Sequence, residues 1–343
     1  ITLTRDLNVR GRGPTSDRGL SLVSFGDNTI SSTVNVIVAN NFTRMTASTG
    51  TLTFDTSSTI DTSGAGGSNP HTRYNEFGAI NGFKLADIVV NGAITGDGGF
   101  LFQGGNQVHW NPNATSGFTG QFRVQNGSYQ QGGMIITSTG VLGDRNSTGT
   151  ASVLDMNSGM VEVRMDNPTL QVNDGSNANA YFRSSATFVL DNAGGLSNTT
   201  FNQTLNLGDI LYEENRDFVV ESRNGFGLTV NSYSVNGGNN SQDVINRIEG
   251  GGLLTITGDY SGNNDTGNRL YRFEDNGDTL ITGGFMVGAG GNKTLHKDGI
   301  GTLTIAGTNT NFVDVVDLVR GTIAITDFDS LGSGSTDTIR MSD

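Results

Sequence analysis

The sequence KDGIGTLTIAGTNTNF occupies residues 297–312, and RGTIAITDFDSLGSG follows at residues 320–334. Within them, GTLTI begins at Gly301 and GTIAI begins at Gly321, 20 residues later. Both pentapeptides alternate apolar residues with small or polar ones, which is the period of a strand with one buried face. The glycine before each strand allows a bend through positive φ. Two like strands at this offset predict stacked coils, a β-solenoid. The residues expected to point inward are Leu303, Ile305, Ile323 and Ile325.

A regular order of lysine, glycine, asparagine and apolar residues runs through the same stretch. Its members are Lys297, Gly299, Gly301, Leu303, Ile305, Gly307, Asn309, Phe312, Gly321, Ile323, Leu331, Gly332 and Gly334. This order closely resembles the autotransporter-associated β-strand repeat, which is found in passenger domains of bacterial autotransporters and in large surface proteins of other bacteria. The resemblance implies a right-handed parallel β-helix. The chain departs from the repeat at residues 313–316, where Val-Asp-Val-Val replaces the usual Gly/Thr-rich turn.

Weaker copies of the pattern are spread along the chain. Residues 118–124 resemble the middle of the repeat, and residues 251–258 resemble its start. Residues 50–54 and 159–163 repeat only a glycine followed by apolar alternation. This distribution predicts a single β-solenoid segment over residues 1–343, with the clearest repeat at 297–334.

The composition favours an all-β fold. The chain has 51 Gly and only 4 Pro, and no stretch sustains a helical period of 3.6 residues. The best helical candidate is Gln242 to Arg247, which would form one or two turns. We expect coils of about 20–25 residues. Asparagines stacked on successive coils are expected to satisfy each other's amides.

Charge and cysteine content restrict the class of protein. With 33 acidic and 20 basic residues, the net charge of −13 argues against nucleic-acid binding. The absence of cysteine suits a secreted chain that relies on repetition rather than disulfides. No apolar stretch reaches the length of a membrane span. Together with the resemblance, these features predict a secreted or cell-surface bacterial protein.

One acidic turn is a candidate calcium site. Glu274, Asp275 and Asp278 gather carboxylates around Gly277, as calcium loops do. The segment 327–330, Asp-Phe-Asp-Ser, is a weaker candidate. The alternative interpretation of both segments is a solvated turn without metal. We expect no other cofactor.

An enzyme is the main alternative, because right-handed β-helices also include polysaccharide lyases and hydrolases. Such enzymes need clustered carboxylates on one face. The densest charged cluster, at residues 213–217, is expected to be an exposed loop. His109 and Trp110 could form an aromatic platform for a sugar, although a lone tryptophan more often packs in a core. We expect no catalytic residues.

The sequence therefore predicts an extracellular structural or adhesive protein, with a self-assembling fibre subunit as one form. The alternative is a β-helical polysaccharide-degrading enzyme. Expected partners are other copies of the chain, joined through strand-like ends, or a host or carbohydrate surface. The segment Ile1 to Val9 is the expected donor strand for self-association.

Overall fold

The computed structural model describes most of the chain. The described residues are 1–10, 22–37, 42–63, 74–78, 86–103, 107–113, 118, 120, 122–125, 133–137, 154–166, 180–193, 204–213, 217–236, 242–262, 267–287, 291–309, 315–331 and 338–341. The chain divides into two compact units. Unit 1 comprises Ile1–Met165 and Thr169–Asn177, and unit 2 comprises Asp166–Pro168 and Ala178–Asp343.

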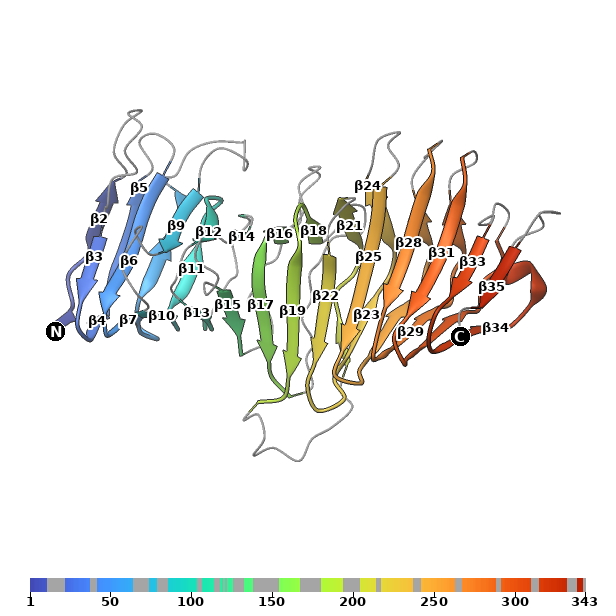
Figure 1. Ribbon diagram of the computed structural model, residues 1–343. Helices are drawn as coiled ribbons and strands as arrows, with labels where there is room; N and C mark the ends of the chain where they lie inside the picture. Colours follow the sequence, from blue (N-terminus) through green and yellow to red (C-terminus); the bar gives the residue numbers. More distant parts are fainter. Residues whose placement is uncertain are drawn as a thin grey trace. The chain divides into compact units, whose positions relative to one another are not determined.

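Unit 1 is a parallel β-solenoid built from three sheets (Figure 1). Among the described strands, the chain passes through all three sheets in turn up to residue 103, and it then alternates between two of them. Sheet 1A contains β1 (Thr2–Leu3), β4 (Asn28–Ile30), β7 (Thr51–Phe54), β10 (Asp87–Val90), β13 (Gln107–Trp110), β15 (Gly133–Ile136) and β17 (Gly159–Arg164). Sheet 1B contains β2 (Leu7–Arg10), β5 (Thr33–Ile37), β8 (Thr59–Asp61) and β11 (Ala93–Thr95). Sheet 1C contains β3 (Leu22–Phe25), β6 (Phe42–Thr49), β9 (Tyr74–Gly78), β12 (Gly99–Gln103), β14 (Phe122–Gln125) and β16 (Leu154–Asn157).

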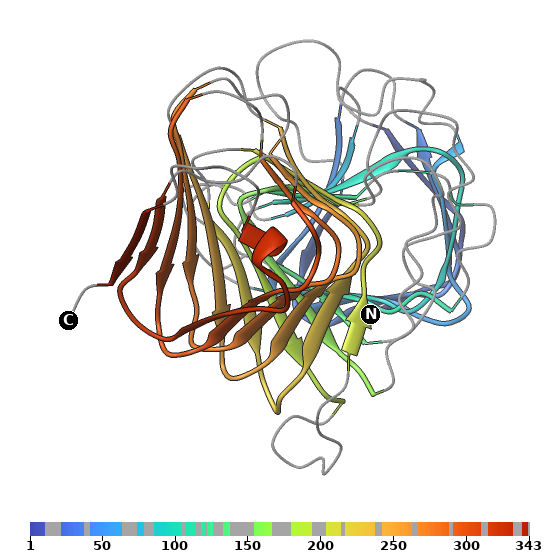
Figure 2. The same ribbon diagram turned by 90° about the vertical axis from the view of Figure 1, so that its right-hand side faces the viewer.

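Unit 2 repeats this plan, and Figure 2 shows its coils nearly end-on. Sheet 2A contains β19 (Ala186–Asp191), β22 (Asp217–Ser222), β25 (Gln242–Glu249), β28 (Arg269–Glu274), β31 (Lys293–Asp298), β33 (Val315–Leu318) and β35 (Thr338–Met341). Sheet 2B contains β20 (Thr204–Asn206), β23 (Gly227–Val230), β26 (Leu253–Ile256), β29 (Asp278–Ile281), β32 (Thr302–Ile305) and β34 (Thr322–Ile325). Sheet 2C contains β18 (Ala180–Phe182), β21 (Ile210–Glu213), β24 (Tyr233–Asn236), β27 (Tyr260–Gly262) and β30 (Phe285–Val287).

The fold is all-β, as the alternation predicts. The described residues contain no α-helix, and the short red turn in Figure 2 is the 3-10 helix η3 (Phe328–Leu331). The expected helix from Gln242 to Arg247 is wrong, because these residues belong to β25 and pair with β22 and β28. The pairing of β25 on both sides outweighs the weak local preference for helix.

Coil length varies more than the expected 20–25 residues. Val108 pairs with Ile88, 20 positions earlier in the sequence, whereas Ile88 pairs with Leu52, 36 positions earlier. The side chains keep their register across these different lengths, since all three are buried in the core. Parallel pairing between coils therefore depends on where each strand falls, and the connections absorb the difference.

The core of unit 1 is centred on a group of aromatic rings. Trp110 is fully buried, with ring centroids 5.0 Å from Phe100, 5.6 Å from Phe102 and 5.2 Å from Phe122. Phe118 is also fully buried and lies 5.5 Å from Phe100. These contacts confirm that Trp110 is a packing residue.

The core of unit 2 contains an aromatic stack along sheet 2C. Tyr233 and Tyr260 stack at 4.7 Å and 6°, and Tyr260 and Phe285 stack at 4.8 Å and 19°. These residues begin β24, β27 and β30 and are paired in register from coil to coil. Identical positions on successive coils thus bring like side chains into direct contact.

The repeat that the sequence singles out forms the C-terminal coils of unit 2. Leu303 and Ile305 are fully buried in β32, which confirms their inward orientation. Ile323 and Ile325 occupy the same rows on β34, but they are only half-buried because β34 has a strand on one side only. The predicted inward rows are therefore correct, and the burial of their side chains decreases from β32 to β34.

The glycines of this repeat have two different roles. Gly299 and Gly321 adopt φ values of 100° and 86°, a region that favours glycine. Gly301 instead allows close packing, since a Cβ at this position would overlap the carbonyl oxygen of Gly277 on the preceding coil. The expected positive φ is thus present at Gly321, whereas the space between coils requires glycine at Gly301.

Amide pairs link successive coils, as predicted. Asn35 Nδ2 donates to Asn8 Oδ1 at 3.1 Å, and Asn111 Nδ2 donates to Asn91 Oδ1 at 3.4 Å. Each pair joins two strands or turns at equivalent positions of neighbouring coils.

The segment Ile1 to Val9 lies within the sheets of its own chain. β1 pairs with β4 and β2 pairs with β5, both in parallel. Strands β1, β2 and β3 lie at one edge of their sheets. The segment is therefore part of a coil, and its strands are already paired on one side.

Candidate functional site

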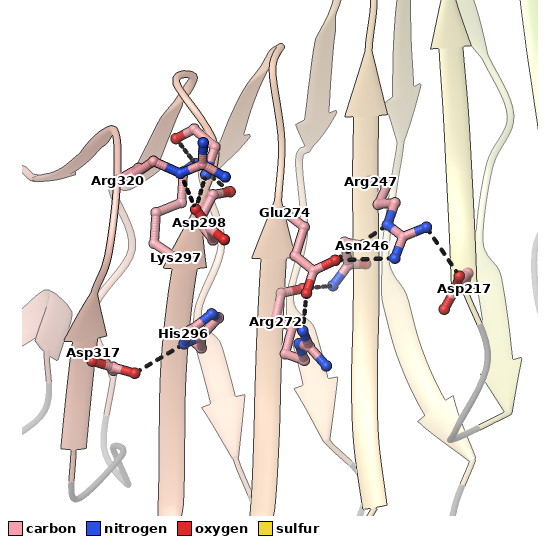
Figure 3. Close-up of polar contacts among 11 residues, drawn as sticks. Asp217, Asn246, Arg247, Arg272, Glu274, His296, Lys297, Asp298, Asp317 and Arg320 are labelled. Carbon is pink, nitrogen blue, oxygen red and sulfur yellow. Dashed lines mark hydrogen bonds and ion pairs between the residues drawn. The ribbon is translucent and has the colours of Figure 1, made fainter. Parts of the chain in front are cut away.

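The outward side of sheet 2A, together with Arg320 just after β33, carries a group of charged side chains in contact with one another. We call it the charged face (Figure 3). Strand alternation aims these side chains outward, while their neighbours in sequence enter the core. The charged face consists of Asp217, Arg247, Arg272, Glu274, His296, Asp298, Asp317 and Arg320.

Arg247 joins carboxylates from two neighbouring coils. Its Nη1 lies 3.2 Å from Asp217 Oδ2 on β22, and its Nη2 lies 3.1 Å from Glu274 Oε2 on β28. Glu274 also pairs with Arg272 of its own strand. The ion pairs therefore run across β22, β25 and β28, perpendicular to the strands.

Two further pairs extend the charged face toward the C-terminus. His296 Nδ1 lies 2.9 Å from Asp317 Oδ2, and Arg320 Nε lies 2.6 Å from Asp298 Oδ1. The hydrogen bond from Arg320 holds the pKa of Asp298 below its usual range, and the same bond raises the pKa of Arg320. Both groups remain charged around neutral pH.

The acidic side chains of the charged face are all engaged in ion pairs. Asp217, Glu274, Asp298 and Asp317 each contact a basic side chain. These ion pairs are only partly exposed, and pairs near the surface contribute about 0–1 kcal/mol each. The arrangement fits a hydrophilic lateral surface that ties neighbouring coils together.

Beneath the charged face, Lys297 is buried at the corner between sheets 2A and 2B. Its side chain is 0% exposed, and its Nζ donates to the carbonyl oxygens of Gly299 at 2.9 Å and Asp298 at 3.2 Å. The sequence places Lys297 in the repeat but gives it no role. The structure shows that the lysine of the repeat satisfies the carbonyl groups of the glycine turn that follows it.

The three calcium candidates do not form a metal site in this structure. Glu274 points outward to two arginines, Asp275 is 0% exposed, and Asp278 Oδ1 accepts the backbone N–H of Thr302 at 2.8 Å. Among the residues with described positions, no group of three or more His, Cys, Asp or Glu could hold a metal ion. Adjacent carboxylates on a strand and a turn face different directions, which adjacency in the sequence conceals.

The second acidic segment has a structural role. Asp327 directly precedes η3. Its Oδ1 accepts the N–H of Asp329 at 3.1 Å, and its carbonyl oxygen accepts the N–H of Ser330 at 3.1 Å. The carbonyl oxygen of Ser330 in turn accepts from the Asn309 side chain. These carboxylate and carbonyl oxygens close a turn.

Asn309 connects two coils with its backbone and side chain. Its Oδ1 accepts the N–H of Phe285 in β30, its Nδ2 donates to the carbonyl oxygen of Ser330, and its N–H donates to the carbonyl oxygen of Asp329 at 2.9 Å. Asn309 is the asparagine of the repeat, and its spacing after Ile305 is the sequence signal that singles it out. Sequence reasoning could not predict that it links β30 to η3.

The sugar platform at His109 and Trp110 is wrong. Trp110 is fully buried, whereas His109 faces outward with its Nε2 3.8 Å from Asp87 Oδ2. In the charged cluster at 213–217, residues 214–216 lie outside the described part of the chain, and Asp217 belongs to the charged face.

Comparisons with protein-family models, with curated proteins and with solved structures found no match to this chain. The resemblance to the autotransporter-associated repeat therefore stays a prediction. In the part of the chain that the structure describes, no helix has the length and apolar character to cross a membrane.

Proposed function

We propose that the chain is a structural or adhesive segment of a bacterial surface protein, displayed outside the cell. The observation that carries this proposal is the solenoid of three sheets in each unit, where the same buried rows repeat from coil to coil. A core of this kind grows along one axis and forms a stiff scaffold. The resemblance of residues 297–334 to a repeat of bacterial surface proteins supports the location.

The charged face supports a scaffold role in a second way. Its ion pairs join β22, β25 and β28 and then β31 to residues of the following coil. These ion pairs connect neighbouring coils on the solvent side and keep the surface hydrophilic.

Self-association is part of the proposal and would proceed through the outer strands of the sheets. β34 and β35 lie at the edges of sheets 2B and 2A, and Ile339 and Met341 of β35 are 62% and 78% exposed. An edge strand offers free N–H and C=O groups that a strand of another copy can complete. Because β1 and β2 are paired within their own chain, a second copy would add to an edge rather than receive a free donor strand.

Light scattering after size-exclusion chromatography, with negative-stain microscopy, tests this proposal on the purified chain. We expect assemblies that grow with protein concentration and persist in high salt, since main-chain pairing is insensitive to screening. The Ile339→Lys/Met341→Lys variant should remain monomeric. Leu253→Lys is the matched control, because Leu253 is 43% exposed but lies on β26, which has a strand on both sides.

A monomer at all concentrations would contradict self-association and would leave the adhesive role to be tested by binding to host cells and glycans. Release of reducing sugar from pectin or alginate would instead support the enzyme. That activity would have to be lost on substitution of acidic residues to overturn the proposed function.

A further inference from the structure

The corner that contains Lys297 also buries an acid from the preceding coil. Asp275 directly follows β28, and Lys297 lies near the end of β31. The register pairs Phe273 with Lys297 and Glu274 with Asp298, so Asp275 lies beside the turn that Lys297 caps. Both the Asp275 and the Lys297 side chains are 0% exposed. Two groups of opposite charge are thus removed from water at one corner of unit 2.

The two groups differ in how well their polar atoms are satisfied. Lys297 donates to two carbonyl oxygens, as described above. Asp275 Oδ2 accepts from Thr279 Oγ1 at 3.1 Å, but Asp275 Oδ1 has no hydrogen-bond partner among the described atoms. An ionised carboxylate without a full set of donors is costly in a buried position, whereas a neutral carboxyl group costs much less.

The charged groups around Asp275 act in opposite directions. Burial has the largest influence and raises the pKa of Asp275 to about 7. Lys297 on β31 favours the ionised form, while Glu249 on β25 and Asp278 on β29 disfavour it. The attraction of Lys297 is smaller than the effect of burial on Asp275, so the lysine does not fully offset the cost of the buried carboxylate. Burial also lowers the pKa of Lys297.

We propose that this corner is a pH-sensitive element that stabilises the C-terminal coils of unit 2 as the surroundings become acidic. Protonation of Asp275 removes the buried negative charge and leaves a neutral group beside Thr279. Deprotonation restores a carboxylate with one unpaired oxygen and loosens the turn between β28 and β29. The unit would thus be most resistant to unfolding in mildly acidic surroundings.

The direction follows from linkage between protonation and folding. Because the folded-state pKa is above the ordinary value of 3.8, the folded state holds a proton that the unfolded state has lost between pH 3.8 and about 7. The stabilising contribution is complete below pH 3.8 and is lost as the pH rises to about 7. At tenfold per pH unit, the loss corresponds to a change of about a thousandfold in the unfolding equilibrium constant.

Urea denaturation of the full chain at a series of pH values between about 4 and about 8 tests this proposal. In the wild type, the midpoint of the unit 2 transition should fall as the pH rises. Asp275→Asn, which keeps the shape and removes the charge, should largely abolish this dependence and raise stability at the alkaline end. Asp97→Asn is the matched control, because Asp97 is an exposed acid in unit 1. It should keep the wild-type pH dependence.

A titration of the Asp275 carboxyl group by carbon-13 NMR on the wild-type chain tests the same idea without relying on a folded variant. A midpoint near neutral pH is expected. A midpoint below pH 5, or an Asp275→Asn variant with the same pH dependence as the wild type, would overturn the proposal.

Discussion

Substitution of Ile305 tests whether the inward rows of unit 2 carry its stability. Ile305 is fully buried in β32, between Ile281 of β29 and Ile325 of β34, with which it is paired in register. Replacing Ile305 with alanine removes buried apolar atoms and leaves a cavity between two coils, which costs about 2–5 kcal/mol. Ile305→Asp should cost more, since it also buries an unpaired charge.

Ile325 is the matched control because it lies on the same row with the same side chain. It is half-buried and has a strand neighbour on one side only. We therefore expect Ile325→Ala to destabilise unit 2 by about half as much as Ile305→Ala, since the transfer contribution scales with buried apolar area.

The assay is urea denaturation, with each unit followed by its own signal. Near-ultraviolet circular dichroism of the tyrosine stack reports on unit 2, and fluorescence of the single tryptophan, Trp110, reports on unit 1. The tyrosine transition should move to lower urea concentration in Ile305→Ala. Equal midpoints for the two variants, or an unchanged midpoint for Ile305→Ala, would refute the argument that the more deeply buried Ile305 contributes more to stability than Ile325.

Three further predictions concern the repeat and the aromatic core. Gly301→Ala should lower the urea midpoint of unit 2 strongly, because its Cβ would overlap the backbone of Gly277. Gly251→Ala is the control: its Cβ has open space, so it should cost only about 1 kcal/mol from its positive φ. Equal effects of the two substitutions would contradict the close-packing argument. Asn309→Ala should destabilise the C-terminal coils by about 1–3 kcal/mol, since it leaves the buried N–H of Phe285 without its acceptor, and faster hydrogen exchange at this amide should accompany the loss. Trp110→Ala should cost about 3–5 kcal/mol of unfolding free energy in unit 1, because Trp110 is fully buried. Unchanged stability in urea denaturation would contradict this packing role.

Local patterns in the sequence predicted the strands and their buried faces well. The alternation at Leu303 and Ile305 places both side chains in the core, because a strand turns successive residues to opposite sides regardless of what surrounds it. The preference of a lone tryptophan for packing was correct for Trp110. The same local reasoning failed at Gln242 to Arg247, where pairing with two neighbouring strands decides the conformation.

The candidate site could be predicted only in part. The glycines, Lys297 and Asn309 stand out in the repeat, but the repeat does not reveal their partners. Those of the Asn309 side chain, Phe285 and Ser330, lie more than 20 residues away in the sequence. Glu274 and Asp275 are adjacent in sequence and yet face arginines on one side and the core on the other. Grouping carboxylates by adjacency therefore suggested a metal site that the fold disperses.

By itself, the sequence determined that this chain forms β-strands with one apolar face and that these strands stack as coils. Only the tertiary structure decided the arrangement of the strands in three sheets, the division into two units and the burial of Asp275 beside Lys297. The physical reason is the range of the interactions. Side-chain alternation is a property of a few consecutive residues, whereas pairing between coils joins positions 20 to 36 residues apart through connections of unequal length.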